Sequence, residues 1–256
     1  GLSQQWSFCL TDNAGSRHYG HTIVFDGDVR AEKHKFALGA MSVCVLSRTA
    51  HFAFFGKLLR TLLAGARAHA ATRAAPLALD YFARQLTRAI QRPARDTTLT
   101  LRIDGLASPP LSWRSGIVHP LDSCSASAPA ACGASLTDLF SRLSVEDVLT
   151  VVAHLVTDGK VLLHCAERSA LTPLATALQA LCFPLLPQCT FVPYMPTKLA
   201  RTLLQAPTPF LFGIESERDG TLPLTVRKTI ARLTGADAEF ALLVVDLSLR
   251  PAGHAR

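Results

Sequence analysis

The residues best suited to covalent chemistry are a histidine and a cysteine at the end of an apolar run. His164 and Cys165 directly follow Val161-Leu162-Leu163, a segment typical of a buried strand. A thiolate at that place, just before a helix, can lie in a ring of loop amides and attack a bound phosphate. The spacing therefore raises the hypothesis of a cysteine-dependent phosphatase with Cys165 as its nucleophile.

The residues after Cys165 do not support this hypothesis. A phosphatase of this kind has an arginine after a loop of five residues, and Leu171 occupies that position. The loop 166–170 has no glycine to let its backbone wrap a phosphate, Glu167 would repel the anion, and Arg168 comes too early. The sequence favours a structural strand end and leaves the phosphatase as a distant alternative.

Ser144, Glu146 and Asp147 begin a second segment of interest. Ser144 is a good helix N-cap, and Asp147 three residues later predicts a capping box. The helix over 144–157 is expected to end at Asp158-Gly159. The two first-turn carboxylates either serve only the cap and the helix dipole or face a partner. The apolar face of this helix is expected to comprise Val145, Val148, Leu149, Val152, Leu155 and Val156.

The net charge of +7 is concentrated between residues 57 and 102, which hold nine cations and two acids. Within this stretch a predicted amphipathic helix, ended by Pro93, carries a stripe of arginines opposite its apolar face. The stripe is either a solvated face or a surface that attracts anionic lipid or an acidic partner. Nucleic acid is not an expected partner, because no aromatic residues interleave with the basic ones. The stripe consists of Arg84, Arg88, Arg92 and Arg95.

Composition excludes several other classes of protein. The chain has 256 residues, of which 49% are apolar and 18% charged, so it is not intrinsically disordered. No apolar run approaches the ~18 residues that cross a bilayer. The seven cysteines form no C-x-x-C pair, so we expect no metal site and a reducing compartment.

The chain also lacks the motifs of several enzyme classes. Phosphate-binding loops, dinucleotide fingerprints and serine nucleophile elbows are all absent from the sequence. His154, in the middle of the helix over 144–157, is expected to be structural rather than a metal ligand. A chain without a visible catalytic apparatus points to a binding surface.

The predicted elements form an α/β protein with two lobes. Several strands precede a long helix over 47–75, which favours an α+β N-terminal lobe. From 144 to 246, helices and strands alternate, which is typical of helices layered on a mostly parallel sheet. One helix of this second lobe is expected to start at Thr172-Pro173, with proline in its first turn. The boundary between the lobes is expected near 95–105.

The segment 143–213 resembles the central part of a DENN domain. That family's core starts with Leu-Ser-x-Glu-Asn, which Leu143 to Asp147 match except that Asp147 replaces the asparagine. It closes with Ala-Pro-x-Pro-[Phe/Tyr]-x-x-Gly, which Ala206 to Gly213 match. The family's Trp-Gln-His is replaced by Pro187-Gln188-Cys189. Other matching segments, in order, are Phe8 to Asp12, Gly15 to Gly20, Cys44 to Arg48, Lys160 to His164, Ser169 to Thr172, Phe183-Pro184, Phe191 to Pro196 and Val244 to Leu247.

The resemblance implies a two-lobe fold. Residues 1–98 are expected to form the end of an upstream, longin-like α+β lobe with a helical linker, and residues 99–256 a central three-layer α/β lobe. The family's activity implies a guanine-nucleotide exchange factor that promotes GDP release from a Rab-type small GTPase in vesicle traffic. No cofactor and no covalent chemistry are expected. The implied location is the cytoplasm, peripherally at vesicle or endosomal membranes.

The resemblance also implies where the GTPase binds. Ser144, Glu146 and Asp147 are the candidate contact residues, because carboxylates at the helix start could meet basic or Mg²⁺-linked groups of the GTPase. An alternative within the family is a scaffold that binds a GTPase without exchanging its nucleotide. A further alternative is assistance to GTP hydrolysis by an arginine on an exposed loop, for which Arg114 or Arg168 is available.

Overall fold

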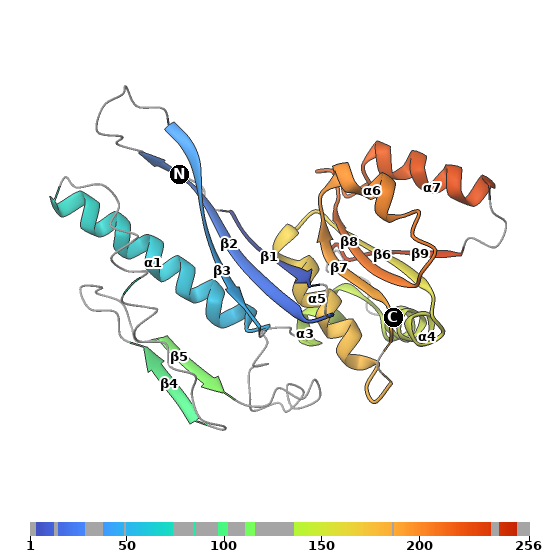
Figure 1. Ribbon diagram of the computed structural model, residues 1–256, viewed down its shortest axis with the longest axis horizontal. Helices are drawn as coiled ribbons and strands as arrows, with labels where there is room; N and C mark the ends of the chain where they lie inside the picture. The colour runs from blue at the N-terminus through green and yellow to red at the C-terminus, as the bar shows by residue number, and fades with distance from the viewer. Residues whose placement is uncertain are drawn as a thin grey trace.

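A computed structural model describes residues 4–12, 15–28, 38–48, 50–73, 84, 97–101, 111–115, 136–185, 187–236 and 241–249. The first strands of the chain form a three-stranded antiparallel sheet (Figure 1). Its order is β1-β2-β3. A turn joins the first two strands, with the Ser16 amide donating to Asp12 Oδ1 at 2.8 Å and Gly15 at φ 80°. The strands are β1 (Gln4–Thr11), β2 (Arg17–Asp28) and β3 (Leu38–Ser47).

A long helix covers one face of this sheet. Helix α1 (Phe52–Arg73) lies within the expected span of 47–75, and its Leu59 and Leu63 pack on Ile23 and Phe25 of β2. Of the next predicted helix only Arg84 is described, as a helical, exposed residue. Arg88, Arg92 and Arg95 lie outside the described residues. A two-stranded antiparallel sheet follows along the chain, formed by β4 (Thr97–Leu101) and β5 (Leu111–Ser115).

The second half of the chain is built on a parallel sheet with strand order β7-β8-β6-β9. Alternate residues of β6 point to opposite faces: Val161 and Leu163 join the core under α4 and α5, and Leu162 joins the core under α6 and α7. The expectation of an α/β protein with a largely parallel sheet is confirmed. The strands are β6 (Lys160–Cys165), β7 (Thr190–Met195), β8 (Phe210–Glu215) and β9 (Leu242–Asp246).

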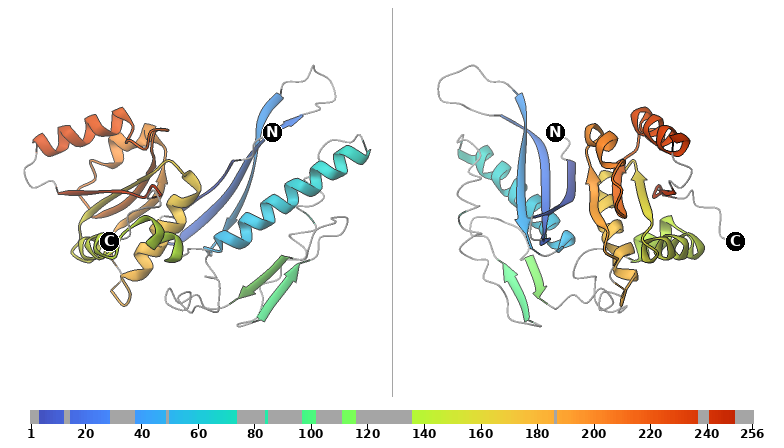
Figure 2. Two further views of the ribbon diagram at one scale, coloured as in Figure 1. Left: turned by 180° about the vertical axis from the view of Figure 1, so that it is seen from behind. Right: turned by 45° about the vertical axis from the view of Figure 1, so that its right-hand side comes forward.

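Helices cover both faces of the parallel sheet (Figure 2). The connection from β6 skips one strand position and reaches β7 at one edge of the sheet. The chain then reverses direction: β8 lies between β7 and β6, and β9 lies on the other side of β6. Because such crossovers are right-handed, reversing direction moves the helices to the opposite face. One face carries α3 (Leu136–Arg142), α4 (Val145–Val156) and α5 (Arg168–Leu181), and the other carries α6 (Thr197–Leu203) and α7 (Leu224–Ala236).

Two sequence expectations for these helices are wrong. Helix α5 begins at Arg168 rather than at Thr172-Pro173, so Pro173 lies inside it. The helix starts earlier because the Arg168 side chain is fixed by Glu215 and because Ala170 and Leu171 are buried. On α4 the expected apolar face is only partly buried, because Val145 and Leu149 are exposed. Helix α3 was not predicted.

The three-stranded antiparallel sheet and the parallel sheet both contribute side chains to one of the hydrophobic clusters. Strand β1 packs against α5 and β7, and Cys9, Tyr19 and Phe52 belong to the cluster of buried side chains under α4 and α5. The hydroxyl of Thr172 on α5 donates to the Ser7 carbonyl of β1 at 2.5 Å. In the part of the chain that the structure describes, none of the helices is long and apolar enough to span a membrane.

Candidate functional site

The predicted capping box closes the first turn of α4. The Ser144 hydroxyl accepts from the Asp147 amide at 3.1 Å, and the Asp147 carboxylate accepts from the Ser144 amide at 3.1 Å. These two bonds satisfy amides that a helix start otherwise leaves unpaired. Asp147 and Ser144 are half-buried, whereas Glu146 is exposed. Of the three predicted contact residues, Glu146 is therefore the one whose carboxylate is directed to solvent.

Two large apolar side chains stand exposed beside Glu146. Val145 and Leu149 are each 62% exposed, whereas Val148, Val151 and Leu155 are buried. The sequence did not assign Val151 to the apolar face, and it placed Val145 and Leu149 there together with Val148 and Leu155, which is wrong for Val145 and Leu149. At 100° per residue they lie at the flank of the stripe that faces the sheet, so the sheet does not reach them. An exposed apolar pair one turn apart is typical of a protein-binding surface.

A groove of about 420 Å³ runs between α4 and the edge strand β9. Asp147 and Thr150 line it from α4, and Val244 and Asp246 line it from β9. Val244 is 38% exposed, and Leu249, at the end of the groove, is 63% exposed. We call this groove, together with the exposed Val145, Glu146 and Leu149 of α4, the α4–β9 surface, which combines apolar and acidic side chains.

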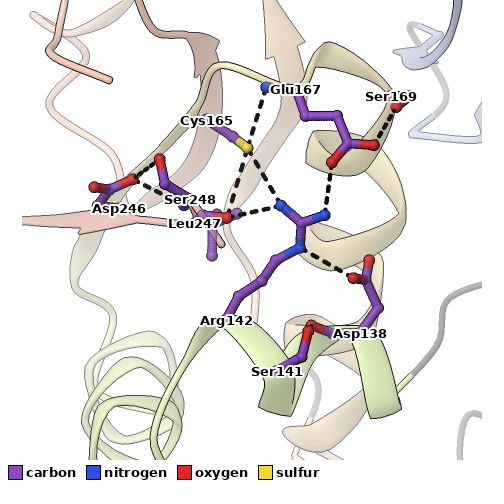
Figure 3. Close-up of polar contacts among 9 residues, drawn as sticks. All are labelled: Asp138, Ser141, Arg142, Cys165, Glu167, Ser169, Asp246, Leu247 and Ser248. Atoms are coloured by element: carbon purple, nitrogen blue, oxygen red, sulfur yellow. Dashed lines mark hydrogen bonds and ion pairs between the residues drawn. The ribbon is translucent and has the colours of Figure 1, made fainter. Parts of the chain in front are cut away.

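A buried arginine holds the wall of this groove in place (Figure 3). Arg142 of α3 is 5% exposed and donates to the Leu247 carbonyl at 3.0 Å, beyond the end of β9. Its guanidinium also bonds to Asp138 at 3.1 Å and to Glu167 at 2.7 Å. The hydrogen bond from Arg142 lowers the pKa of Glu167. Arg142 thus ties α3, the β6–α5 loop and the segment after β9 together.

Cys165 lies beside this arginine and is not arranged as a nucleophile. It is 1% exposed, and its thiol donates to the Leu247 carbonyl at 3.5 Å. Burial raises the pKa of the thiol, which disfavours the reactive thiolate. Only Ala166 and Glu167 separate β6 from α5, so no phosphate-wrapping loop of five residues exists. The geometry argues against the phosphatase alternative.

The carboxyl ends of β6 and β8 carry a second polar group. In an open parallel sheet, small-molecule sites form where neighbouring strands lead to helices on opposite faces, as β6 and β8 do here. His164 Nδ1 lies 2.9 Å from Ser216 Oγ, and Arg168 bonds to Glu215 through Nε at 2.8 Å. The Arg168 guanidinium also stacks over Trp6 of β1, with 4.7 Å to the ring centroid. The polar groups at this crevice pair with one another, and strand β1 packs over them.

The remaining residues singled out in the sequence are placed as follows. Arg168 lies in the first turn of α5 and Arg114 lies within β5, opposite Thr98, so neither is on a loop. Arg84 is exposed. His154 is half-buried on α4, and its Nε2 atom has no hydrogen-bond partner in the described part of the chain.

The sequence analysis missed a basic cluster on the opposite face of the sheet. Lys198 and Arg201 of α6 and Lys228 and Arg232 of α7 line one pocket. Outside 57–102 the charges of the chain balance, so the linear charge count gave no sign of this cluster. The available signal was the spacing, since Arg201 follows Lys198 at position i+3 and Arg232 follows Lys228 at position i+4, which places each pair on one helix face.

Comparison with known proteins gives consistent matches. The DENN domain-containing proteins 2B of mouse and of human are each 27% identical to this chain over 216 residues, which cover 84% of this chain and 17% of those proteins. The mouse DENN domain-containing protein 1C is 26% identical over 234 residues, covering 88% of this chain and 27% of that protein. The chain spans well under a third of the length of these curated relatives.

A family model decides the relationship. The model of the DENN (AEX-3) domain matches residues 39–230, from β3 to the middle of α7. This range is well over half of the 256 residues and contains both α4 and the parallel strands β6, β7 and β8. The resemblance found in the sequence motifs is thereby confirmed, and the chain belongs to the DENN domain family.

Proposed function

We propose that this chain promotes GDP release from a Rab-type small GTPase, as a guanine-nucleotide exchange factor in membrane traffic. The observation that carries the proposal is membership of the DENN family over residues 39–230, since Rab exchange is that family's typical activity. The α4–β9 surface supports it, because exposed Val145 and Leu149 beside an acidic groove suit a protein partner.

Under this proposal the chain divides as the family does. Residues 1–98 supply the end of the upstream, longin-like lobe with its linker, and residues 99–256 supply the central α/β lobe. The three-stranded antiparallel sheet with α1 and the helix-covered parallel sheet are consistent with this division. The shared core of β1, α5 and β7 keeps the two parts in a fixed relation while a GTPase binds.

Exchange of this kind needs no nucleophile and no cofactor. The factor binds the nucleotide-free GTPase better than the loaded form, and by linkage this difference weakens nucleotide binding. The interaction acts on the switch loops and on the Mg²⁺ that bridges the phosphates of the GTPase. Ser144 and Asp147 fix the start of α4, and the Glu146 carboxylate is free of the cap and directed outward. We assign Glu146 to direct contact and Ser144 and Asp147 to positioning it.

The test is the release of a fluorescent GDP analogue from a panel of Rab GTPases in the presence of the purified chain. Acceleration with one member would establish exchange and identify the partner. Capture of a nucleotide-free Rab without acceleration would instead favour the second candidate, a DENN-related scaffold or GTPase-binding module without exchange activity. If the chain neither accelerates GDP release from any Rab nor captures a nucleotide-free Rab, both proposals are contradicted.

The family alternative of assisted GTP hydrolysis has less support. An arginine finger needs a mobile, exposed guanidinium. Arg168 is paired with Glu215 and stacked on Trp6, and Arg114 lies within a strand. Faster GTP hydrolysis by a Rab, lost on replacing Arg168 with alanine, is the result that would favour it.

Peripheral binding at vesicle or endosomal membranes is the proposed location of the activity. Arg84, with Arg88, Arg92 and Arg95 in the same stripe, is the surface that the sequence offers for anionic lipid. Binding to anionic vesicles that weakens with salt and weakens further in Arg84→Glu would support this role. Vesicle binding that ignores salt contradicts it.

The phosphatase alternative is tested separately. Burial of Cys165 and the absence of a phosphate loop lead us to expect no hydrolysis of a generic phosphoester. Hydrolysis that disappears in Cys165→Ser would reverse this conclusion.

A further inference from the structure

A second groove, of about 380 Å³, lies between α6 and α7 on the face of the sheet opposite α4. Both helices run across the same side of the parallel sheet and contact each other (Figures 1 and 2). The side chains that line it are Thr197, Lys198, Ala200, Arg201, Thr225, Lys228, Thr229 and Arg232.

The charge of this groove is one-sided. Four of its lining residues are cations, and in the part of the chain that the structure describes no carboxylate lines it. Lys198, Arg201, Lys228 and Arg232 are all exposed, and none makes an ion pair with another described residue. By contrast, Arg142 and Arg168 are each paired with carboxylates. Four cations around one concavity repel one another, and an anion with several charges relieves this repulsion.

Hydroxyl groups complete the lining. Thr197 and Thr225 add hydroxyls among the four cations, whereas the Thr229 hydroxyl donates to the Thr225 carbonyl at 2.8 Å. Phosphate oxygens accept hydrogen bonds from lysine, arginine and hydroxyl donors alike, and arginine offers them a bidentate fork. The donor set therefore suits a ligand with more than one phosphate group better than a carboxylate.

An exposed leucine lies beside the cations of α7. Leu224, at the start of this helix, is 56% exposed. Leu224 is four residues before Lys228, so the two lie on the same side of α7. Cations with neighbouring exposed apolar side chains are the combination that holds a protein at the boundary between lipid headgroups and acyl chains.

We propose that the α6–α7 groove binds the phosphorylated headgroup of an anionic inositol lipid in a membrane. The four cations, with Thr197 and Thr225, hold the phosphates, and Leu224 enters the interfacial layer of the bilayer. The parallel sheet separates this groove from the α4–β9 surface, so a membrane on one face leaves the other face free for a protein partner.

The test is co-sedimentation of the chain with vesicles, without any GTPase. Phosphatidylcholine vesicles are prepared with phosphatidylinositol 4,5-bisphosphate, or with phosphatidylserine at the same total charge. We expect tighter binding to the inositol lipid. Each Lys or Arg near an anionic surface contributes a factor of about five, so Lys198→Gln with Arg232→Gln is expected to weaken binding about 25-fold.

The matched control is Arg48→Gln with Lys57→Gln, which removes the same charge from exposed cations of the N-terminal sheet and α1. Retained binding in this control, with a loss in the groove variant, supports the proposal. Equal losses in both variants, or no loss in the groove variant, overturn it. The proposal that the ligand is a membrane lipid would be contradicted if free inositol trisphosphate bound as tightly as the vesicles. It would also be contradicted if an acidic peptide, rather than lipid, occupied the groove.

Discussion

The Ser144 hydroxyl lies 2.6 Å from the Asp147 carboxylate, as a donor to it, at the first turn of α4. The same carboxylate oxygen, Oδ2, also accepts the Ser144 amide at 3.1 Å, so this oxygen is engaged in the cap. Glu146, directly before Asp147, is exposed instead. This division separates stability from binding at adjacent positions and makes the proposed contact testable residue by residue.

The first prediction contrasts Glu146 with Asp147. Asp147→Ala removes half of the capping box and is expected to lower the free energy of unfolding by about 1 kcal/mol. Glu146→Ala is expected to leave stability unchanged and to slow Rab nucleotide release about fivefold, through loss of a charged contact. Urea denaturation and GDP-release rates measure the two effects. Equal losses of stability and rate in both variants would remove the contact role.

The second prediction concerns the exposed apolar pair on α4. Val145→Ser with Leu149→Ser is expected to weaken capture of the nucleotide-free GTPase at least about tenfold, because each apolar side chain buried at an interface contributes on the order of 1 kcal/mol or more. The melting temperature should hardly change, since both side chains are already 62% exposed. The matched control is Leu46→Ser on β3, which is also 62% exposed and should bind normally.

The third prediction concerns the buried guanidinium of Arg142. Arg142→Met keeps most of the side-chain volume but leaves the Leu247 carbonyl with only the weaker Cys165 thiol donor at 3.5 Å and removes the partner of Glu167, so we expect a loss of about 2 kcal/mol in the free energy of unfolding. Glu167→Gln should cost less than about 1 kcal/mol, because the Glu167 side chain is 53% exposed. Chemical denaturation compares the two variants. An Arg142→Met protein as stable as the parent would refute the proposed anchoring of this segment.

The fourth prediction is a loss of stability in mild acid. Burial, with a smaller effect of His51, lowers the pKa of His21 from 6.5 to about 4. The folded state therefore resists protonation that the unfolded state accepts below about pH 6.5. The contribution of His21 to the free energy of unfolding is fully present above pH 6.5. It falls by up to about 3 kcal/mol as the pH is lowered from 6.5 to about 4. The lowered pKa of His164, also caused first by burial, acts in the same direction.

His21→Phe tests this assignment. Phenylalanine keeps the ring that stacks on Phe55 at 4.8 Å between centroids, although the Ser7 hydroxyl loses its bond to Nδ1. That loss shifts stability equally at every pH, so the informative quantity is the slope of unfolding free energy between pH 6.5 and 4. We expect a shallower slope in the variant. An unchanged slope would assign the acid sensitivity to other groups.

The sequence predicted features that depend on residues close together in the chain, but not features that depend on packing between distant elements. Ser144 and Asp147 predicted the cap because its hydrogen bonds join residues three apart. The exposure of Leu149 depends on how far the sheet extends beneath α4, and the early start of α5 depends on Glu215, 47 residues away. The basic groove joins cations from two helices whose contact no local pattern specifies.

The chain's sheets differ in type and in place along the sequence, yet they share side chains at their junction. Cys9, Tyr19 and Phe52 lie in the same buried cluster as α5 and β7, and Thr172 holds the backbone of β1. We therefore expect that the two halves on either side of the predicted boundary at residue 98 do not unfold independently. Cutting the chain there would expose the apolar sides of α5 and β7, and the two halves should melt together in a single calorimetric transition.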